Sequence, residues 1–471
     1  MNIFCWRQLM LDNFQCLCDP VHGKPSLGER ARPIQTLVWY PAQAAGSPVR
    51  YVDYVRTEAT EEEFGRPQSQ VEAFIADKLQ AASARVGAAS ARAAFDQRMW
   101  ARLAAPPLAG RFPLVIYAPG VGGAAHEAAD LGEYLASHGY VVVSSRSMGT
   151  RTVRMNIDLE GIDAQARDIG FLISYAGTLP QADVTHIAAT GWSWGGMTNV
   201  FAAARDDRIS ALVSLDGTRE PEYTRRISPV QVGIPWLYVS RQLATIPELN
   251  KQGIETSFSL LNELKYAEIH QVVMHPMEHA DFSPAILRFA RPARFVEYSR
   301  EEVEQAYRWT ARYVLEFLNA TLKGDASGDA FLNRSPLSNG MPRHMARVQH
   351  TAAEAGPLPT RGGFAAELAA RGFDQAQKVY SQLRQRNPAF VLSEDEINLW
   401  GYSLLGESPR NAIEIFRLGV ALYPSSSNLH DSLGEAYERV KDTPAAIGSY
   451  RRSTELDPNN ANAAQRLKIL K

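Results

Sequence analysis

The sequence contains too few cysteines for a disulfide framework. Only three occur among its 471 residues, at Cys5, Cys16 and Cys18, near the start of the chain. Bridges confined to that segment would leave the rest of the chain untied, and an odd number of cysteines fits a reducing compartment. The stability of the fold must therefore come from packed cores.

A surplus of either charge is also missing. The chain has 49 Lys and Arg residues against 51 Asp and Glu residues, which gives a net charge of −2. A nucleic-acid-binding protein usually carries a basic surplus, and this sequence has no basic run interleaved with aromatic residues. We therefore expect no nucleic acid among its partners.

The sequence also lacks long hydrophobic runs. No uninterrupted apolar stretch approaches the ~20 residues that span a bilayer, so we expect no transmembrane segment. Polar residues such as Arg7 and Asp12 interrupt the apolar patches near the start, and no signal-peptide core is present as written. The sequence as written predicts a cytoplasmic location, or a periplasmic or secreted one if the true start lies upstream with a signal peptide.

Short apolar runs alternate with helical segments over the first two thirds of the chain. The runs predicted as strands are 34–40, 112–117, 140–144, 187–192, 211–215, 235–239 and 269–274. Such alternation predicts a mostly parallel sheet with helices on both faces. We expect the first strand to stop at Pro41 and residues of about 51–105 to form a helical insertion.

The C-terminal part of the chain repeats itself. A shift of 34 positions brings Ala412, Phe416 and Pro424 onto Ala446, Tyr450 and Pro458, and a looser copy precedes them at Ala376, Tyr380 and Pro388. A helix-turn-helix unit of this length is typical of the tetratricopeptide repeat. The sequence thus predicts an α/β domain over 1–325, a linker over 326–360 and a small all-α repeat domain over 361–471.

The segment Gly191-Trp192-Ser193-Trp194-Gly195 has the pattern G-x-S-x-G. It lies between a predicted strand and a predicted helix, which is the setting of a nucleophile elbow. The flanking glycines are needed because the serine backbone is strained and a nearby Cβ would clash. We predict that Ser193 is a nucleophile; the alternative is a glycine-rich turn with an incidental serine.

A serine nucleophile needs a base and an orienting acid. Asp216 ends the strand that follows the elbow helix and is the acid candidate, with Glu248 as a fallback. In this arrangement the histidine follows the acid along the chain. His270 lies within a predicted strand, so the base is His279, which precedes Ala-Asp-Phe, or alternatively His275.

An oxyanion hole needs two backbone N–H groups aimed at one point. We predict that Trp194, directly after the nucleophile, supplies one of them. Val121, within Gly120-Val121-Gly122-Gly123, is predicted to supply the other. Candidates for lining the substrate pocket are His126, Trp192 and His275.

The loop that contains both candidate bases also has the pattern H-x-x-E-H, an inverted zinc-protease motif. That motif requires a helix that places both histidines on one face. Pro284 allows such a helix barely two turns, so we expect no metal ligands here.

Taken with these motifs, residues 30–325 resemble the α/β-hydrolases related to platelet-activating factor acetylhydrolase and the dienelactone-hydrolase-like proteins. The matching segments are 38–42, 112–123, 135–140, the elbow, 215–217 and 279–282. The resemblance implies ester hydrolysis without a metal or an organic cofactor, and it supports Asp216 because acetylhydrolases place the acid after the same strand. Dienelactone hydrolases use a cysteine where this chain has Ser193, and the loop around His279 departs from the acetylhydrolase pattern by one residue.

The sequence therefore favours a serine esterase, or lipase-like hydrolase, acting on a small-molecule ester. Its appended repeats are expected to bind a protein or peptide partner. One alternative is a catalytically idle hydrolase scaffold in which the repeats are the working part. Another is an amidase or peptidase, because the same triad serves both kinds of bond.

Overall fold

A computed structural model describes most of the chain. The described residues are 3–8, 34–61, 63–150, 154–217, 221–227, 232–242, 251, 258–354, 360–386, 390–406 and 408–470. The chain divides into two compact units, Met1–Gly356 and Pro357–Lys471. Each unit has its own buried core, and each is described by itself.

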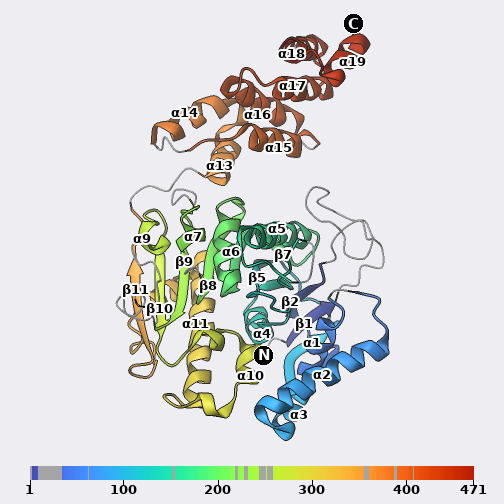
Figure 1. Cartoon of the computed structure of the whole chain (residues 1–471). Helices are drawn as coiled ribbons and strands as arrows, with labels where there is room; N and C mark the ends of the chain where they lie inside the picture. Colours follow the sequence, from blue (N-terminus) through green and yellow to red (C-terminus); the bar gives the residue numbers. More distant parts are fainter. Residues whose placement is uncertain are drawn as a thin grey trace. The chain divides into compact units, whose positions relative to one another are not determined.

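An eleven-stranded sheet forms the centre of the first unit, in the order β11-β10-β9-β8-β7-β5-β6-β2-β1-β4-β3 (Figure 1). Six neighbouring strands, β10, β9, β8, β7, β5 and β6, are parallel to one another. They are flanked by β2 and β11, which are antiparallel to their neighbours. The bounds are β1 Ile3–Gln8, β2 Thr36–Ala42, β3 Ser47–Arg50, β4 Arg98–Leu103, β5 Phe112–Ala118, β6 Val141–Ser145, β7 Ala182–Trp192, β8 Ile209–Leu215, β9 Trp236–Arg241, β10 Ile269–Met274 and β11 Ala346–Thr351.

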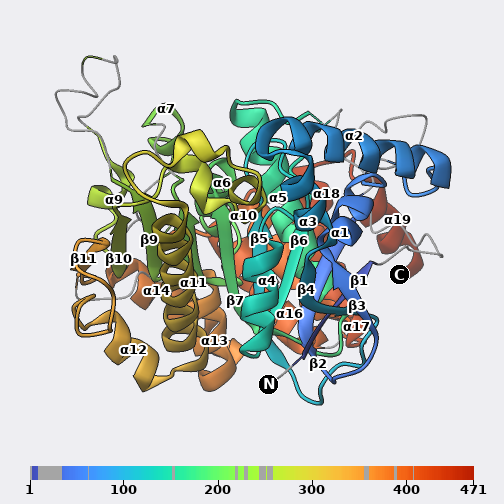
Figure 2. The same cartoon turned by 90° about the horizontal axis from the view of Figure 1, so that it is seen from below.

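Helices cover both faces of this sheet because successive strand residues point to opposite sides. In β5, Val115 and Tyr117 join the core on the side of α4 (Ala129–Ser137) and α11 (Arg300–Lys323). Leu114 and Ile116 join the core on the side of α5 (Leu159–Ala176) and α6 (Trp194–Ala203). Figure 2 shows α4 and α11 in front of the sheet. The predicted mostly parallel sheet with helices on both faces is therefore present.

The region predicted as a helical insertion, about 51–105, contains three helices and then a strand. The helices are α1 Tyr51–Glu58, α2 Gln68–Val86 and α3 Ala88–Asp96. In β4, Met99 and Ala101 are buried while Arg98 and Trp100 are exposed, which is the period-two pattern of a strand.

The strand predicted to stop at Pro41 instead runs through it to Ala42. Proline has no N–H to donate, but β2 pairs with β6 only as far as Trp39, so no ladder bond to β6 is lost at Pro41.

The segment predicted to be a linker, 326–360, holds regular structure in its first part. Helix α12 (Ala326–Leu332) contacts α11, and β11 pairs with β10 along its whole length. Part of this segment thus belongs to the first unit, although its content of Gly, Ser and Pro predicted a linker.

The second unit consists of helices. They are α13 Arg361–Arg371, α14 Ala376–Arg386, α15 Glu394–Leu405, α16 Pro409–Leu422, α17 Ser427–Arg439, α18 Thr443–Leu456 and α19 Ala461–Leu470. Consecutive helices pack as hairpins at small residues. A Cβ on Gly434 of α17 would lie 2.7 Å from the Tyr450 ring of α18, and Gly401 of α15 meets Phe416 of α16 in the same way.

Among the described residues, no helix combines the length and apolar character that a membrane crossing would need.

Candidate active site

Ser193 stands at a sharp turn between β7 and α6. Its φ of 55° and ψ of −122° lie in a region that non-glycine residues rarely adopt. The turn is possible because its neighbours lack side chains: a Cβ on Gly191 would lie 2.6 Å from the Ala118 carbonyl oxygen, and one on Gly195 would meet the same atom. The strained backbone presents the serine at the carboxyl ends of the parallel strands.

The structure brings Ser193, Asp216 and His279 together. His279 Nε2 lies 2.8 Å from Ser193 Oγ, and His279 Nδ1 lies 2.6 Å from Asp216 Oδ2. Asp216 directly follows β8, and His279 begins a short 3-10 helix, His279–Phe282, in the loop after β10. Three segments that are distant in sequence thus meet at the carboxyl ends of the parallel strands.

Asp216 is buried and held from several sides. Its side chain is shielded from solvent, and its Oδ1 accepts a hydrogen bond from the Arg241 N–H at 3.2 Å. Arg241 Nε lies 3.5 Å from Oδ2, close to the atom that faces His279. Sequence reasoning did not identify Arg241, although its position at the end of the next strand, β9, was a usable signal.

The loop of His279 is fixed by its neighbours. The Trp192 indole Nε1 donates to the His279 carbonyl oxygen at 2.8 Å, and the two rings lie 5.1 Å apart. Asp281 accepts from the Glu278 N–H at 2.8 Å and pairs with Arg294. Trp192, predicted as a pocket residue, therefore packs directly on the histidine.

Two backbone segments approach Ser193 at the place predicted for an oxyanion hole. Trp194 is the first residue of α6, where a helix leaves its N–H groups without intrahelical partners. The Gly120 loop runs close by, because a Cβ on Gly120 would lie 3.5 Å from Ser193 Cβ and 2.7 Å from the Trp192 ring. Val121 follows in that loop and is 43% exposed.

The buried carboxyl group of Glu127 holds the Gly120 loop through a hydrogen bond. Its Oε1 accepts from Tyr117 Oη at 3.0 Å and from the Gly120 N–H at 3.2 Å. Burial raises the pKa of Glu127 to about 8, so the group is mostly protonated at pH 7. The Gly120 N–H is thus engaged by Glu127 and the Gly123 N–H by the Gly120 carbonyl oxygen, and Val121 stays the predicted oxyanion donor of this loop.

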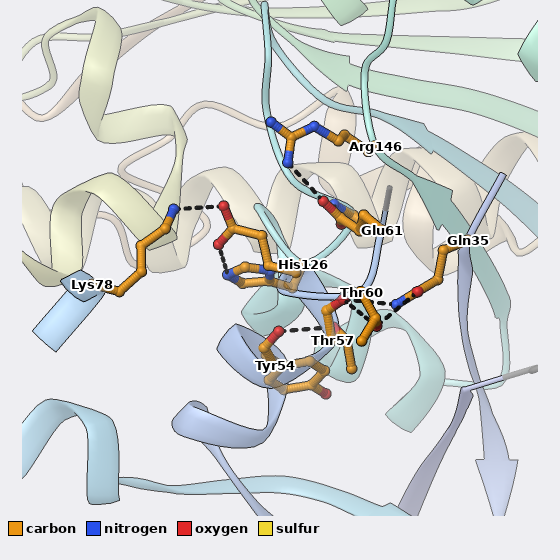
Figure 3. A network of polar contacts seen from close by, with 10 residues as sticks. Gln35, Tyr54, Thr57, Thr60, Glu61, Lys78, His126 and Arg146 are labelled. Atoms are coloured by element: carbon orange, nitrogen blue, oxygen red, sulfur yellow. Dashed lines mark hydrogen bonds and ion pairs between the residues drawn. The ribbon is translucent and has the colours of Figure 1, made fainter. Parts of the chain in front are cut away.

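A second buried carboxyl group, Glu61, ties the helical insertion to the same loop (Figure 3). It accepts from the Ala125 N–H at 2.8 Å and from Arg146 Nη1 at 2.9 Å. Burial raises the pKa of Glu61 to about 7, against the lowering effect of Arg146. Neither Glu61 nor Glu127 was identified from the sequence, because each acts through a contact between distant segments.

His126, predicted as a pocket residue, lies in this network. It is 4% exposed and stacks on the Tyr54 ring, and its Nε2 lies 4.0 Å from Glu58 (Figure 3). Burial lowers its pKa to about 4, so it is neutral at pH 7. These contacts give His126 a structural role in holding α1.

The alternative base and the fallback acid lie elsewhere. His275 Nδ1 lies 2.6 Å from Gln242 Oε1, and the contacts described for it do not reach Ser193 or Asp216. His275 and His279 contact different partners. Glu248 falls outside the described residues.

A large cleft of about 1070 Å³ opens on the α4 and α11 side of the first unit. Its walls include Trp100, Arg288 and Trp309, and none of Ser193, Asp216 or His279 lines it. We place the candidate site at the three residues and not in the cleft, because a nucleophile, a base and an acid meet there.

Comparison with protein-family models and with curated proteins finds no match. Comparison with solved structures finds similarity to a ferulic acid esterase from Streptomyces cinnamoneus, at 19% sequence identity and a TM-score of 0.49, covering 74% of this chain and 96% of that one.

Proposed function

We propose that the first unit is an α/β-hydrolase that cleaves carboxylic esters through an acyl-enzyme on Ser193. The observation that carries the proposal is the continuous contact from Ser193 Oγ to His279 at 2.8 Å and from His279 to Asp216 at 2.6 Å. The strained φ of 55° at Ser193 adds to it, because strain of this kind persists where the surrounding structure holds it for a purpose. The preference for esters rests on the family resemblance of the sequence.

The reaction would follow from the geometry. Ser193 Oγ attacks the ester carbonyl carbon while His279 Nε2 takes the hydroxyl proton. Asp216, held by Arg241, accepts the Nδ1–H bond and stabilises the imidazolium. The N–H groups of Trp194 and Val121 hold the oxyanion. His279 then returns the proton to the leaving alkoxide as the C–O bond breaks, and water, activated by His279, releases the acid.

We propose that the second unit is a tetratricopeptide array that binds a peptide or protein partner. Ala412 and Ala446 are both fully buried at equivalent positions of successive hairpins. Gly401 and Gly434 receive Phe416 and Tyr450 in the same way. This recurrence of small residues against aromatic ones supports a repeated two-helix unit.

A fluorophosphonate probe tests the catalytic proposal directly. It should label the wild-type protein and not the Ser193→Ala variant, whose turnover of p-nitrophenyl acetate should fall by on the order of 10⁴-fold or more. The matched control is Ser210→Ala, a serine of the first unit whose contacts are with Ile187. Labelling with no ester turnover would favour an amidase or peptidase, and no labelling of wild type would favour the idle scaffold.

A further inference from the structure

Two histidines and one glutamate meet at the edge of the sheet, away from the candidate active site. His270 lies in β10 and His350 in β11, two neighbouring strands (Figure 1). The two residues are direct cross-strand partners. Glu268 immediately precedes β10. One potential ligand atom from each residue lies within 4.8 Å of the others, the only such group of three among the described residues.

The strand register explains why the two imidazoles adjoin. The His275 N–H donates to the Met345 carbonyl oxygen, which marks that pair as hydrogen-bonded. Hydrogen-bonded and non-bonded pairs alternate along an antiparallel ladder, so His270 and His350 form a non-bonded pair, in which side chains come closer. Their rings are 4.5 Å apart and nearly parallel.

One nitrogen of each ring lies near the same carboxylate oxygen. His350 Nε2 lies 2.9 Å and His270 Nε2 lies 3.6 Å from Glu268 Oε1. On a tetrahedral zinc ion, with ligand bonds of about 2.0–2.2 Å, neighbouring ligand atoms are about 3.3 Å apart. The two distances from the glutamate oxygen therefore bracket this spacing, and all three ligand atoms lie within 4.8 Å of one another.

The surroundings suit a bound ion with one open side. His270 is 4% exposed, and the Phe317 ring packs against it. His350 and Glu268 are 35% and 43% exposed, which gives an ion access from solvent. Two imidazoles with one carboxylate suit zinc better than magnesium or calcium, which prefer more oxygen ligands.

We propose that Glu268, His270 and His350 bind a zinc ion, or a divalent transition-metal ion of similar ligand preference, that links the edge strand β11 to β10. β11 is exposed along most of its length, and it is the last strand before the chain leaves the first unit. An ion at this point would link the two strands through side chains in addition to their backbone ladder. The proposal is independent of the proposed ester hydrolysis.

Zinc titration of the full-length protein, freed of any affinity tag and treated with a chelator, tests this site. Calorimetry should show one ion bound per chain, and cobalt should give the visible absorption of a low-coordinate site. Zinc should also raise the Tm of the wild type. His350→Ala and Glu268→Gln should each weaken binding by at least about tenfold and remove the rise in Tm.

His186→Ala is the matched control, because His186 pairs with a carboxylate, Asp183, at 2.8 Å but has no second histidine. Its zinc affinity should equal that of the wild type. The proposal is wrong if the wild type shows no saturable zinc binding, or if His350→Ala binds as tightly as the wild type. Loss of the ion on His275→Ala with retention in His350→Ala would place it elsewhere and equally overturn the assignment.

Discussion

Within the proposed triad, His279 connects Ser193 and Asp216, because one of its ring nitrogens faces each of them. We predict that His279→Ala lowers kcat/KM on p-nitrophenyl acetate by on the order of 10⁴-fold, because it removes the proton acceptor. His275→Ala should change it by less than about tenfold, because His275 contacts Gln242. The reverse order of effects would make His275 the base and contradict the geometry.

Glu127 should make the stability of the first unit depend on pH. Its pKa is raised from 4.5 to about 8 in the folded protein, so between these values the folded chain keeps a proton that the unfolded chain releases. Stability should therefore fall as pH rises from about 4.5 to about 8, by on the order of a few kcal/mol at ~1.4 kcal/mol per pKa unit.

Glu127→Gln should reduce this slope, because the amide oxygen can still accept from Tyr117 and Gly120 without any ionisation. Urea unfolding of both proteins at several pH values measures the effect, with the exposed Glu301→Gln as a control for the loss of one carboxyl group. A variant slope equal to that of wild type would mean that Glu127 is ionised in the folded protein. Glu61 and Glu133, whose pKa values are each raised to about 7, should leave part of the slope in place.

At the scale of elements, close helix contacts at glycine support the hairpins of the second unit. Gly434→Ala places a Cβ 2.7 Å from the Tyr450 ring, so we predict a loss of ~1–3 kcal/mol in the stability of this unit. Gly448→Ala, within α18 and with nothing near its Cβ position, should instead stabilise by up to ~1 kcal/mol through helix propensity. Denaturant unfolding followed by circular dichroism compares the two. Equal effects of the two substitutions would argue against close packing at Gly434.

At the scale of the whole molecule, the two compact units should be separable. All the proposed catalytic and oxyanion residues precede the boundary at Gly356. We predict that deleting residues 361–471 leaves kcat/KM on p-nitrophenyl acetate within about tenfold of the full chain. Circular dichroism establishes that the truncated chain is folded. A larger loss in a folded truncated protein would show that the second unit shapes the active site.

The sequence by itself determined the features that depend on neighbouring residues. The G-x-S-x-G pattern located the turn at Ser193, because a strained elbow requires small residues beside it. Short apolar runs predicted the parallel strands, and one of these runs placed Asp216 at the end of β8. The two-residue period of β4 is short and follows an alanine-rich region whose composition favours helix, so composition alone does not reveal this strand.

The tertiary structure alone decided what depends on contacts between distant segments. It placed His279, and not His275, against Ser193 and Asp216, because only the folded loop directs one histidine inward. It brought Glu61 to the loop at Ala125 and paired His270 with His350, which are 80 positions apart in the sequence. Such pairs leave no local pattern, because their partners become neighbours only when the sheet forms.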